Sequence, residues 1–206
     1  AIILGGTLMV MFFCSGARIS HLVLLVILAA IGVGLLIASQ TYRITRIIVF
    51  LDPFKYPLAE GYQIINSLFA LGTGGLFGMG IGKSRQKFFH LPEAYNDFIF
   101  SIIGEELGFI GCVVLMLGFV VFAWRGLRIS MNTDDFFGSQ ASLGLTVLVL
   151  VQFIIHIAVA TSSMPPTGRA LPFISAGGSS LMFLLCSMGI LLNISKYSNT
   201  YRSWSV

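Results

Sequence analysis

The chain has 206 residues, of which 56% are hydrophobic and only 10% are charged, and its formal net charge is +4. Soluble domains carry about 25% charged residues. The composition therefore excludes a soluble globular domain and predicts an integral membrane protein with no nucleic-acid partner. The three cysteines lie in apolar runs without the spacing of metal ligands, so no metal site is expected from them.

Apolar runs, taken in chain order, predict the membrane spans. Residues 1–14 are apolar but shorter than the about 20 residues that a crossing helix needs. We therefore expect them to be the cut end of a longer span, in a C-terminal portion of a longer protein. Complete spans are expected at residues 21–39, 98–124, 139–161 and 177–195. The predicted fold is an all-α, polytopic membrane helix bundle, with about five crossings in one membrane domain over residues 1–206.

Residues 40–97 form a long loop between two of these spans. Apolar residues recur at helical spacing in 42–51 and 62–71, which predicts two short interfacial or re-entrant helices within the loop. The loop side of the bundle carries more Lys and Arg than the opposite side. The positive-inside rule is reliable only for short loops near span ends. Charge alone therefore leaves the orientation of this loop open.

The run from Gly72 to Gly82 is rich in glycine and is followed by Lys83 and Ser84, as at the end of a phosphate-binding P-loop. Phe77 stands where that motif requires a glycine, and the chain has no alternation of strand and helix patterns. The glycines instead predict a sharp, closely packed re-entrant turn. Irregular backbone is tolerated at membrane depth only against protein or a wet cavity.

Asp97 stands at the start of the apolar segment 98–124. It could cap the helix N-terminus or serve as an ionised general base, and the two roles are compatible. The cations Lys83, Arg85 and Lys87 precede it in the loop. They could anchor the loop at lipid headgroups or bind an anionic group such as a lipid pyrophosphate, and both interpretations stay open.

Polar side chains also occur inside the predicted spans, where an ionisable group is a functional hypothesis by default. Glu105 and Glu106 would lie about 12 Å beyond the first acid of their span along a straight helix, which is too far to act on the same bond. Gln152 and His156 are spaced i, i+4 on the next span. We expect these four side chains to make structural hydrogen bonds in the bundle, with Arg169, Gln152 and His156 as candidate partners of the two acids.

Two stretches resemble the signature segments of the SEDS family (shape, elongation, division and sporulation) of polytopic bacterial membrane proteins. They are LPEAYNDFIFSIIGEELGFIG at residues 91–111 and PPTGRALPFISAGGSSL at residues 165–181. The residues of these two stretches are more similar to the FtsW-like division branch than to the RodA-like elongation branch, and the sporulation branch stays open. The resemblance implies about ten spans in the complete protein. This chain would hold the C-terminal half, with loop 40–97 facing outward.

The same resemblance implies a function. SEDS proteins polymerise lipid II into glycan strands, so the chain is expected to be a peptidoglycan glycosyltransferase of cell division. Asp97 would be the general base, and undecaprenyl pyrophosphate would be the leaving group. Substrate binding would fall to Lys83, Arg85, Lys87 and Arg169.

The partners implied by the resemblance are lipid II, a class B penicillin-binding protein that supplies the transpeptidase, and other divisome membrane proteins. The expected location is the bacterial cytoplasmic (inner) membrane, enriched at the division septum. No cofactor is implied with certainty, and a requirement for a divalent cation is left open. Two rival functions remain: a lipid II flippase, which would need Glu105, Glu106 and His156, and a non-catalytic scaffold of the divisome.

Overall fold

The structure is a computed structural model, which describes residues 2–38, 41–57, 60–86 and 97–198. Every regular element in these ranges is helical. Three of the described helices are long and apolar enough to cross a membrane, and they are α6 (Ile99–Met131), α7 (Phe136–Ala160) and α8 (Gly178–Tyr197). Together with the shorter apolar helices that precede them, they confirm the expected all-α, polytopic membrane bundle.

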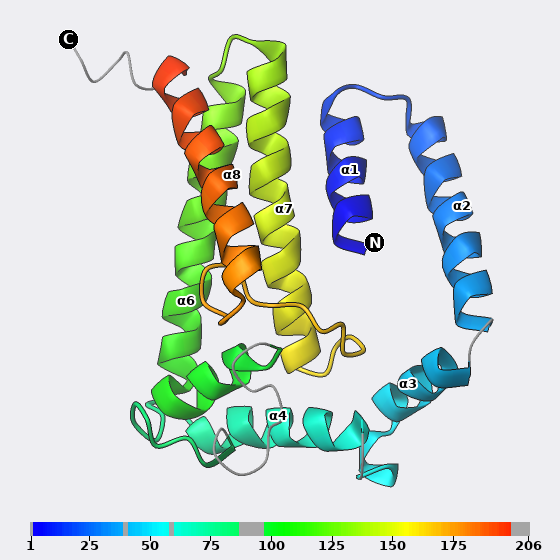
Figure 1. The fold of residues 1–206 in the computed structure, drawn as a ribbon, viewed down its shortest axis with the longest axis vertical. Coiled ribbons are helices and arrows are strands. Elements are labelled where there is room, and N and C mark those ends of the chain that lie inside the picture. Colours follow the sequence, from blue (N-terminus) through cyan, green and yellow to red (C-terminus); the bar gives the residue numbers. More distant parts are fainter. Residues whose placement is uncertain (1, 39–40, 58–59, 87–96, 199–206) are drawn as a thin grey trace.

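The N-terminal helices flank this bundle (Figure 1). Helix α1 (Ile2–Cys14) packs beside α7, and α2 (Ile19–Ala38) stands on the far side of α1, with most of its described side chains exposed. The chain then turns across the lower end of the bundle in Figure 1 as α3 (Thr41–Leu51), a 3-10 turn at Pro53–Lys55 and α4 (Glu60–Gly74). The two short helices expected within the long loop are thus present.

Helix α6 differs from the single straight span expected at 98–124, because it breaks at Gly108. This residue has φ 70° and ψ −167°, a backbone conformation that glycine adopts readily and that other residues avoid. Figure 1 shows the short arm before Gly108 running beside α4 across the end of the bundle, whereas the long arm after it rises along α7. The long arm continues to Met131, beyond the expected end at residue 124.

Two arginines follow residue 124, where the apolar run ends, and both lie on the surface of α6. The guanidinium groups of Arg125 and Arg128 lie 5.1 and 5.0 Å from the ring centroid of Trp124. Cations over an aromatic face are stabilised by the ring quadrupole, so the helix continues through this stretch. The following turn ends at Asp135, which caps α7 by accepting a hydrogen bond of 2.9 Å from the N–H of Gly138.

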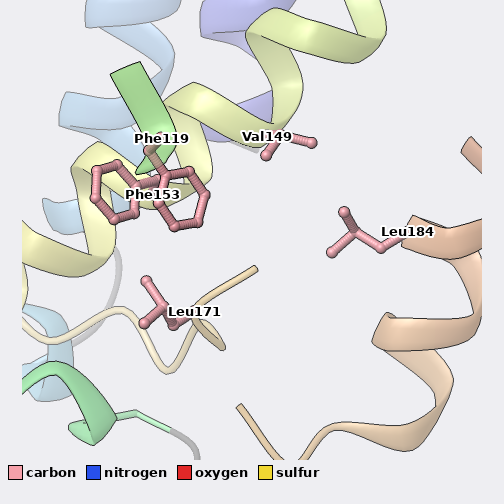
Figure 2. Close-up of a cluster of buried hydrophobic side chains, with 5 residues drawn as sticks. All are labelled: Phe119, Val149, Phe153, Leu171 and Leu184. Carbon is pink, nitrogen blue, oxygen red and sulfur yellow. The ribbon is translucent and has the colours of Figure 1, made fainter. Parts of the chain in front are cut away.

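The core between α6, α7 and α8 is a cluster of five buried side chains (Figure 2). Phe119 and Phe153 stack with their ring centroids 3.7 Å apart and their planes inclined by 12°. Val149, Leu171 and Leu184 complete the cluster. Leu171 belongs to the loop between α7 and α8, so this loop is anchored in the bundle core.

Candidate functional site

Asp97 lies just before the short arm of α6. The N-cap position of the helix is Phe98, with φ −126° and no side-chain cap, so Asp97 is not the N-cap residue, which was one of its two possible roles. The Asp97 side chain is half-buried, and the neighbouring Phe98 ring is buried with Ile102, Ile155 and Val159. This cluster ties the start of α6 to α7 and thereby places the carboxylate at the end of the bundle.

The loop between α7 and α8 reaches the Asp97 carboxylate at Gly168. A β-carbon built on Gly168 would lie 3.5 Å from Oδ2 of Asp97. Gly168 has φ +61°, in the left-handed region that favours glycine. The two stretches that resemble SEDS signatures therefore meet at these two residues, although a complete span separates them in sequence.

Side chains from other helices hold this loop by its carbonyl groups. Gln152 Nε2 donates to the carbonyl of Ala170 at 2.8 Å, and His156 Nδ1 contacts the carbonyl of Arg169 at 2.8 Å. From α3, Arg46 Nη1 donates to the carbonyl of Pro166 at 3.4 Å. Gln152 and His156 thus bind the loop that carries Arg169, rather than the two acids of α6.

The glycine-rich segment after α4 packs against the break in α6, as the expected close-packed turn. The N–H groups of Met79 and Gly80 donate to the carbonyls of Glu105 and Glu106 at 2.9 and 3.0 Å. In return, the N–H groups of Phe109 and Ile110 donate to the carbonyls of Gly75 and Leu76 at 2.9 and 3.2 Å. The backbone groups that the break frees are therefore satisfied by the loop, as buried peptide groups require.

Glycines permit this backbone approach. A β-carbon on Gly74 would collide with the carbonyl of Gly104, and one on Gly78 would collide with the carbonyl of Glu106. At Gly108 it would meet Gly78 N and would lie 2.6 Å from the carbonyl oxygen of Leu76. Packing against α6 therefore requires glycine at positions 74 and 78, and packing against the loop requires it at position 108.

Glu105 takes its partners from the end of the same loop. Its carboxylate is 1% exposed and accepts hydrogen bonds from the Ser84 hydroxyl and, at 3.0 Å, from the N–H of Arg85. The expected partners Arg169, Gln152 and His156 are wrong for this acid. Glu105 precedes the break at Gly108, so it belongs to the short arm of α6 that begins after Asp97 and not to the long arm.

The predicted cations that the structure describes lie on the two loops that border this arrangement. The Lys83, Arg85 and Arg169 side chains are exposed, and Lys87 lies outside the described residues. Glu105 orients the backbone of the Lys83–Arg85 segment against the short arm that follows Asp97. Arg169 adjoins Gly168, whose added β-carbon would lie 3.5 Å from Oδ2 of Asp97. A half-buried carboxylate with nearby exposed cations can deprotonate a hydroxyl and bind an anionic group.

Several residues of the site were not predicted from the sequence. In the sequence, Ser84 stands out only at the end of a P-loop-like run, and Gly168 only as part of a signature segment. Ser67 on α4 bonds to Ser101 on α6 at 2.6 Å and donates to the carbonyl of Ala160 on α7 at 2.8 Å. Small polar residues that join helices are common in membrane bundles, but a lone serine carries no signal that names its partner.

Comparisons with known proteins place the chain in a family. Residues 1–200 match the family described as "Cell cycle protein", which takes in FtsW, RodA and SpoVE. Stage V sporulation protein E of Bacillus subtilis (strain 168) is 51% identical over 193 residues, which is 94% of this chain and 53% of that protein. A "probable peptidoglycan glycosyltransferase FtsW" of Geobacter sp. (strain M18) is 44% identical over 186 residues, covering 90% of this chain and 51% of that protein.

The corresponding FtsW of Bacillus subtilis (strain 168) is 43% identical over 217 residues, which is 98% of this chain and 53% of that protein. Among solved structures, a chain from a study of "polymerization and crosslinking by a peptidoglycan synthase complex" matches with a TM-score of 0.73 and 26% identity, over 97% of this chain and 55% of that chain. The present chain spans about half the length of the curated relatives it matches. It is a multi-pass membrane chain that belongs to the FtsW, RodA and SpoVE family of cell cycle proteins.

Proposed function

We propose that the complete protein is a peptidoglycan glycosyltransferase that polymerises lipid II, with Asp97 as its general base. The observation that carries the proposal is the proximity of Gly168 to the Asp97 carboxylate, since a β-carbon on Gly168 would lie 3.5 Å from Oδ2, and this brings the two signature segments together at one acid. The relatives named peptidoglycan glycosyltransferase support the reaction class. A family name alone does not select a residue, and the proximity of the two segments supports Asp97 as the base.

In the proposed step, Asp97 takes the proton from a hydroxyl of the acceptor sugar. The hydroxyl oxygen then forms a bond to the anomeric carbon of the donor sugar. The bond between that carbon and the pyrophosphate oxygen breaks, and undecaprenyl pyrophosphate leaves with the electron pair. The exposed cations Lys83, Arg85 and Arg169, together with Lys87, would stabilise the negative charge on the leaving group.

The location and partners follow from the same proposal. A lipid-linked donor at the outer face would require loop 40–97 to face outward, beside the cytoplasmic membrane in which the helices lie. Glycan strands must be crosslinked after polymerisation, and the matched solved chain comes from a complex that couples the two steps. We therefore propose a class B penicillin-binding protein as the transpeptidase partner, together with other divisome proteins at the septum.

The decisive experiment measures lipid II polymerisation by the complete protein and its partner in liposomes. Asp97→Asn keeps the shape of the side chain but removes the base, so the rate should fall by about 10²- to 10⁴-fold. Asp52→Asn is the matched control, because Asp52 is exposed in the turn after α3 and its side chain caps no helix. Full polymerisation by Asp97→Asn would disprove the assignment.

The flippase alternative makes the opposite prediction, since translocation would survive Asp97→Asn and would depend on Glu105, Glu106 and His156. A scaffold would tolerate Asp97→Asn in cells as long as the protein reached the septum. Glu105 and His156 are occupied in holding loops. These contacts favour the polymerase over a path of polar groups through the bundle.

A sporulation role is the second candidate for the biological process. Over the matched residues of this chain, identity is 51% to the sporulation protein and 43% to FtsW of the same Bacillus strain. Complementation in that organism separates the two roles. A division enzyme should restore growth after depletion of FtsW, and a sporulation enzyme should restore spore formation in cells that lack the stage V protein.

A further inference from the structure

The loop that carries Gly168 has little structure of its own. Residues 165–170 make no backbone–backbone hydrogen bond to any residue that the structure describes. Pro165 and Pro166 have no N–H to donate. The shape of this stretch must therefore be imposed from outside, by groups that bind its carbonyls.

Two donors on α7 supply this constraint. Gln152 and His156 are one turn apart on one face of the helix, about 6 Å along its axis, and they bind the consecutive carbonyls of Ala170 and Arg169. The later helix residue holds the earlier loop residue, so the loop runs back along α7 toward the core (Figure 1). Directly after this clamp in the chain, Leu171 is 1% exposed and anchors the loop among the core side chains.

The clamp acts on the residue adjacent to the site. Gly168 directly precedes the clamped Arg169, and its left-handed backbone faces the Asp97 carboxylate. A carbonyl oxygen can only accept a hydrogen bond, so Nδ1 of His156 must carry the proton in this contact. The geometry therefore gives Nδ1 of His156 the role of positioning the loop, whereas Nε2 has no hydrogen-bond partner among the described residues.

We propose that Gln152 and His156 are positioning residues of the glycosyltransferase, which hold Gly168 and Arg169 in place beside the general base Asp97. This inference rests on the proposed function. Displacement of a catalytic contact by about 1 Å can cost a factor of about 100 in rate. Neither side chain needs to touch the substrate, and the imidazole of His156 takes no part in proton transfer.

The test compares isosteric variants of the complete protein with its transpeptidase partner in liposomes containing lipid II. Gln152→Met and His156→Leu remove the donors, and kcat should fall by about tenfold to a hundredfold while KM changes by less than about threefold. His156→Asn retains a donor close to the position of Nδ1 and should restore kcat. Gln140→Met is the matched control, because Gln140 lies on the same helix in a groove against α1.

Hydrogen–deuterium exchange gives a readout that does not depend on activity. Exchange in residues 167–175 should rise in Gln152→Met and His156→Leu but stay at the parental level in His156→Asn. If His156→Leu fails to accumulate, Gln152→Met and His156→Asn decide the question between them. If the unsubstituted protein forms no polymer, the proposed function is wrong. The hydrogen–deuterium exchange of residues 167–175 would still show whether Gln152 and His156 hold the loop in place.

Two results would overturn the inference. Parental kcat and parental exchange in both Gln152→Met and His156→Leu would show that the loop holds its position without the clamp. Loss of kcat in His156→Asn with parental exchange in the loop would show that the imidazole itself takes part in the chemistry. An unchanged dependence of kcat on pH in His156→Asn would support a positioning role, because it would show that protonation of the His156 imidazole does not control the rate.

Discussion

Oδ2 of Asp97 lies 3.5 Å from the point that a β-carbon on Gly168 would occupy. The acid comes from the start of the short arm of α6, and the glycine comes from the loop after α7. The separation is an ordinary van der Waals contact, so a methyl group would fit beside the carboxylate but would displace solvent from it. The left-handed φ of Gly168 makes the same position unfavourable for other residues.

Gly168→Ala should therefore reduce polymerisation more than it reduces stability. The left-handed conformation costs a non-glycine residue about 1–2 kcal/mol, and the new methyl group would lie against the general base. We expect a loss of activity of about tenfold or more. The measurement is the initial rate of polymerisation by protein that has been normalised for its amount in the membrane.

Gly16→Ala is the control for this prediction. Gly16 has φ +80° and open space around the added β-carbon, so the variant has the same backbone strain far from the site. It should retain parental polymerisation. Equal losses in the two variants would mean that strain alone, rather than the contact with Asp97, explains the effect of Gly168→Ala.

Gly108→Ala should prevent the protein from folding stably. The substitution adds a β-carbon against the backbone of the glycine-rich segment at a residue with φ +70°. Neither side can move without breaking the hydrogen bonds that Phe109 and Ile110 make to this segment. We expect a loss of about 3 kcal/mol or more, seen as a lower melting temperature in detergent and less protein in the membrane.

Gly118→Ala in the long arm of α6 provides the comparison, because nothing lies within 4 Å of its added β-carbon. Alanine is favoured over glycine inside a helix by about 1 kcal/mol. This variant should match or exceed the parental melting temperature. A stable Gly108→Ala protein would contradict the close packing at the break.

Glu105 should tolerate glutamine but not leucine. In Glu105→Gln the amide oxygen can still accept from the N–H of Arg85, and the amide nitrogen can donate to the Ser84 oxygen, which reverses that hydrogen bond. Glu105→Leu removes the acceptor of both hydrogen bonds, and the loss of a buried acceptor costs about 1–3 kcal/mol for each bond. The melting temperatures of the purified variants test whether Glu105→Gln is more stable than Glu105→Leu. If the site requires the negative charge itself, Glu105→Gln will also have a lower melting temperature than the parental protein.

Leu171→Ala should loosen the loop that carries Gly168. Leu171 packs against the stacked Phe119 and Phe153 rings (Figure 2), and removal of a fully buried leucine side chain costs about 2–5 kcal/mol. The melting temperature and the exchange of residues 167–175 would report the change. Leu185→Ala, which removes a side chain that is 57% exposed on α8, should have little effect on either.

Much of the fold follows from local sequence patterns. Apolar length and composition indicate membrane helices, because each span must satisfy its own backbone hydrogen bonds. The same logic locates the short helices of the long loop. It fails at Gly108, since a glycine inside an apolar run is compatible with either a continuous helix or a break. The outcome depends on whether another segment can bind the backbone groups that a break exposes.

In the candidate site, too, some features follow from the local sequence and others depend on tertiary contacts. Asp97 stands out in the sequence because an acid at the start of a membrane-length apolar run is costly, and the resemblance to a known family names its role. The spacing of residues in the sequence could not predict the partners of Glu105, Gln152 and His156. Each of these side chains binds a group on a segment other than its own helix. Their candidate partners in the sequence were polar side chains, whereas the structure uses backbone groups and Ser84.

The sequence by itself determined the class of protein, the approximate helices and the acid most suited to catalysis, because these depend on composition and on residues close together along the chain. Only the tertiary structure decided that α6 bends at Gly108, that Glu105 holds the glycine-rich loop, and that Gly168 lies against Asp97. Those relationships join segments far apart in sequence. They exist because backbone groups freed from regular helices must find hydrogen-bond partners elsewhere in the bundle.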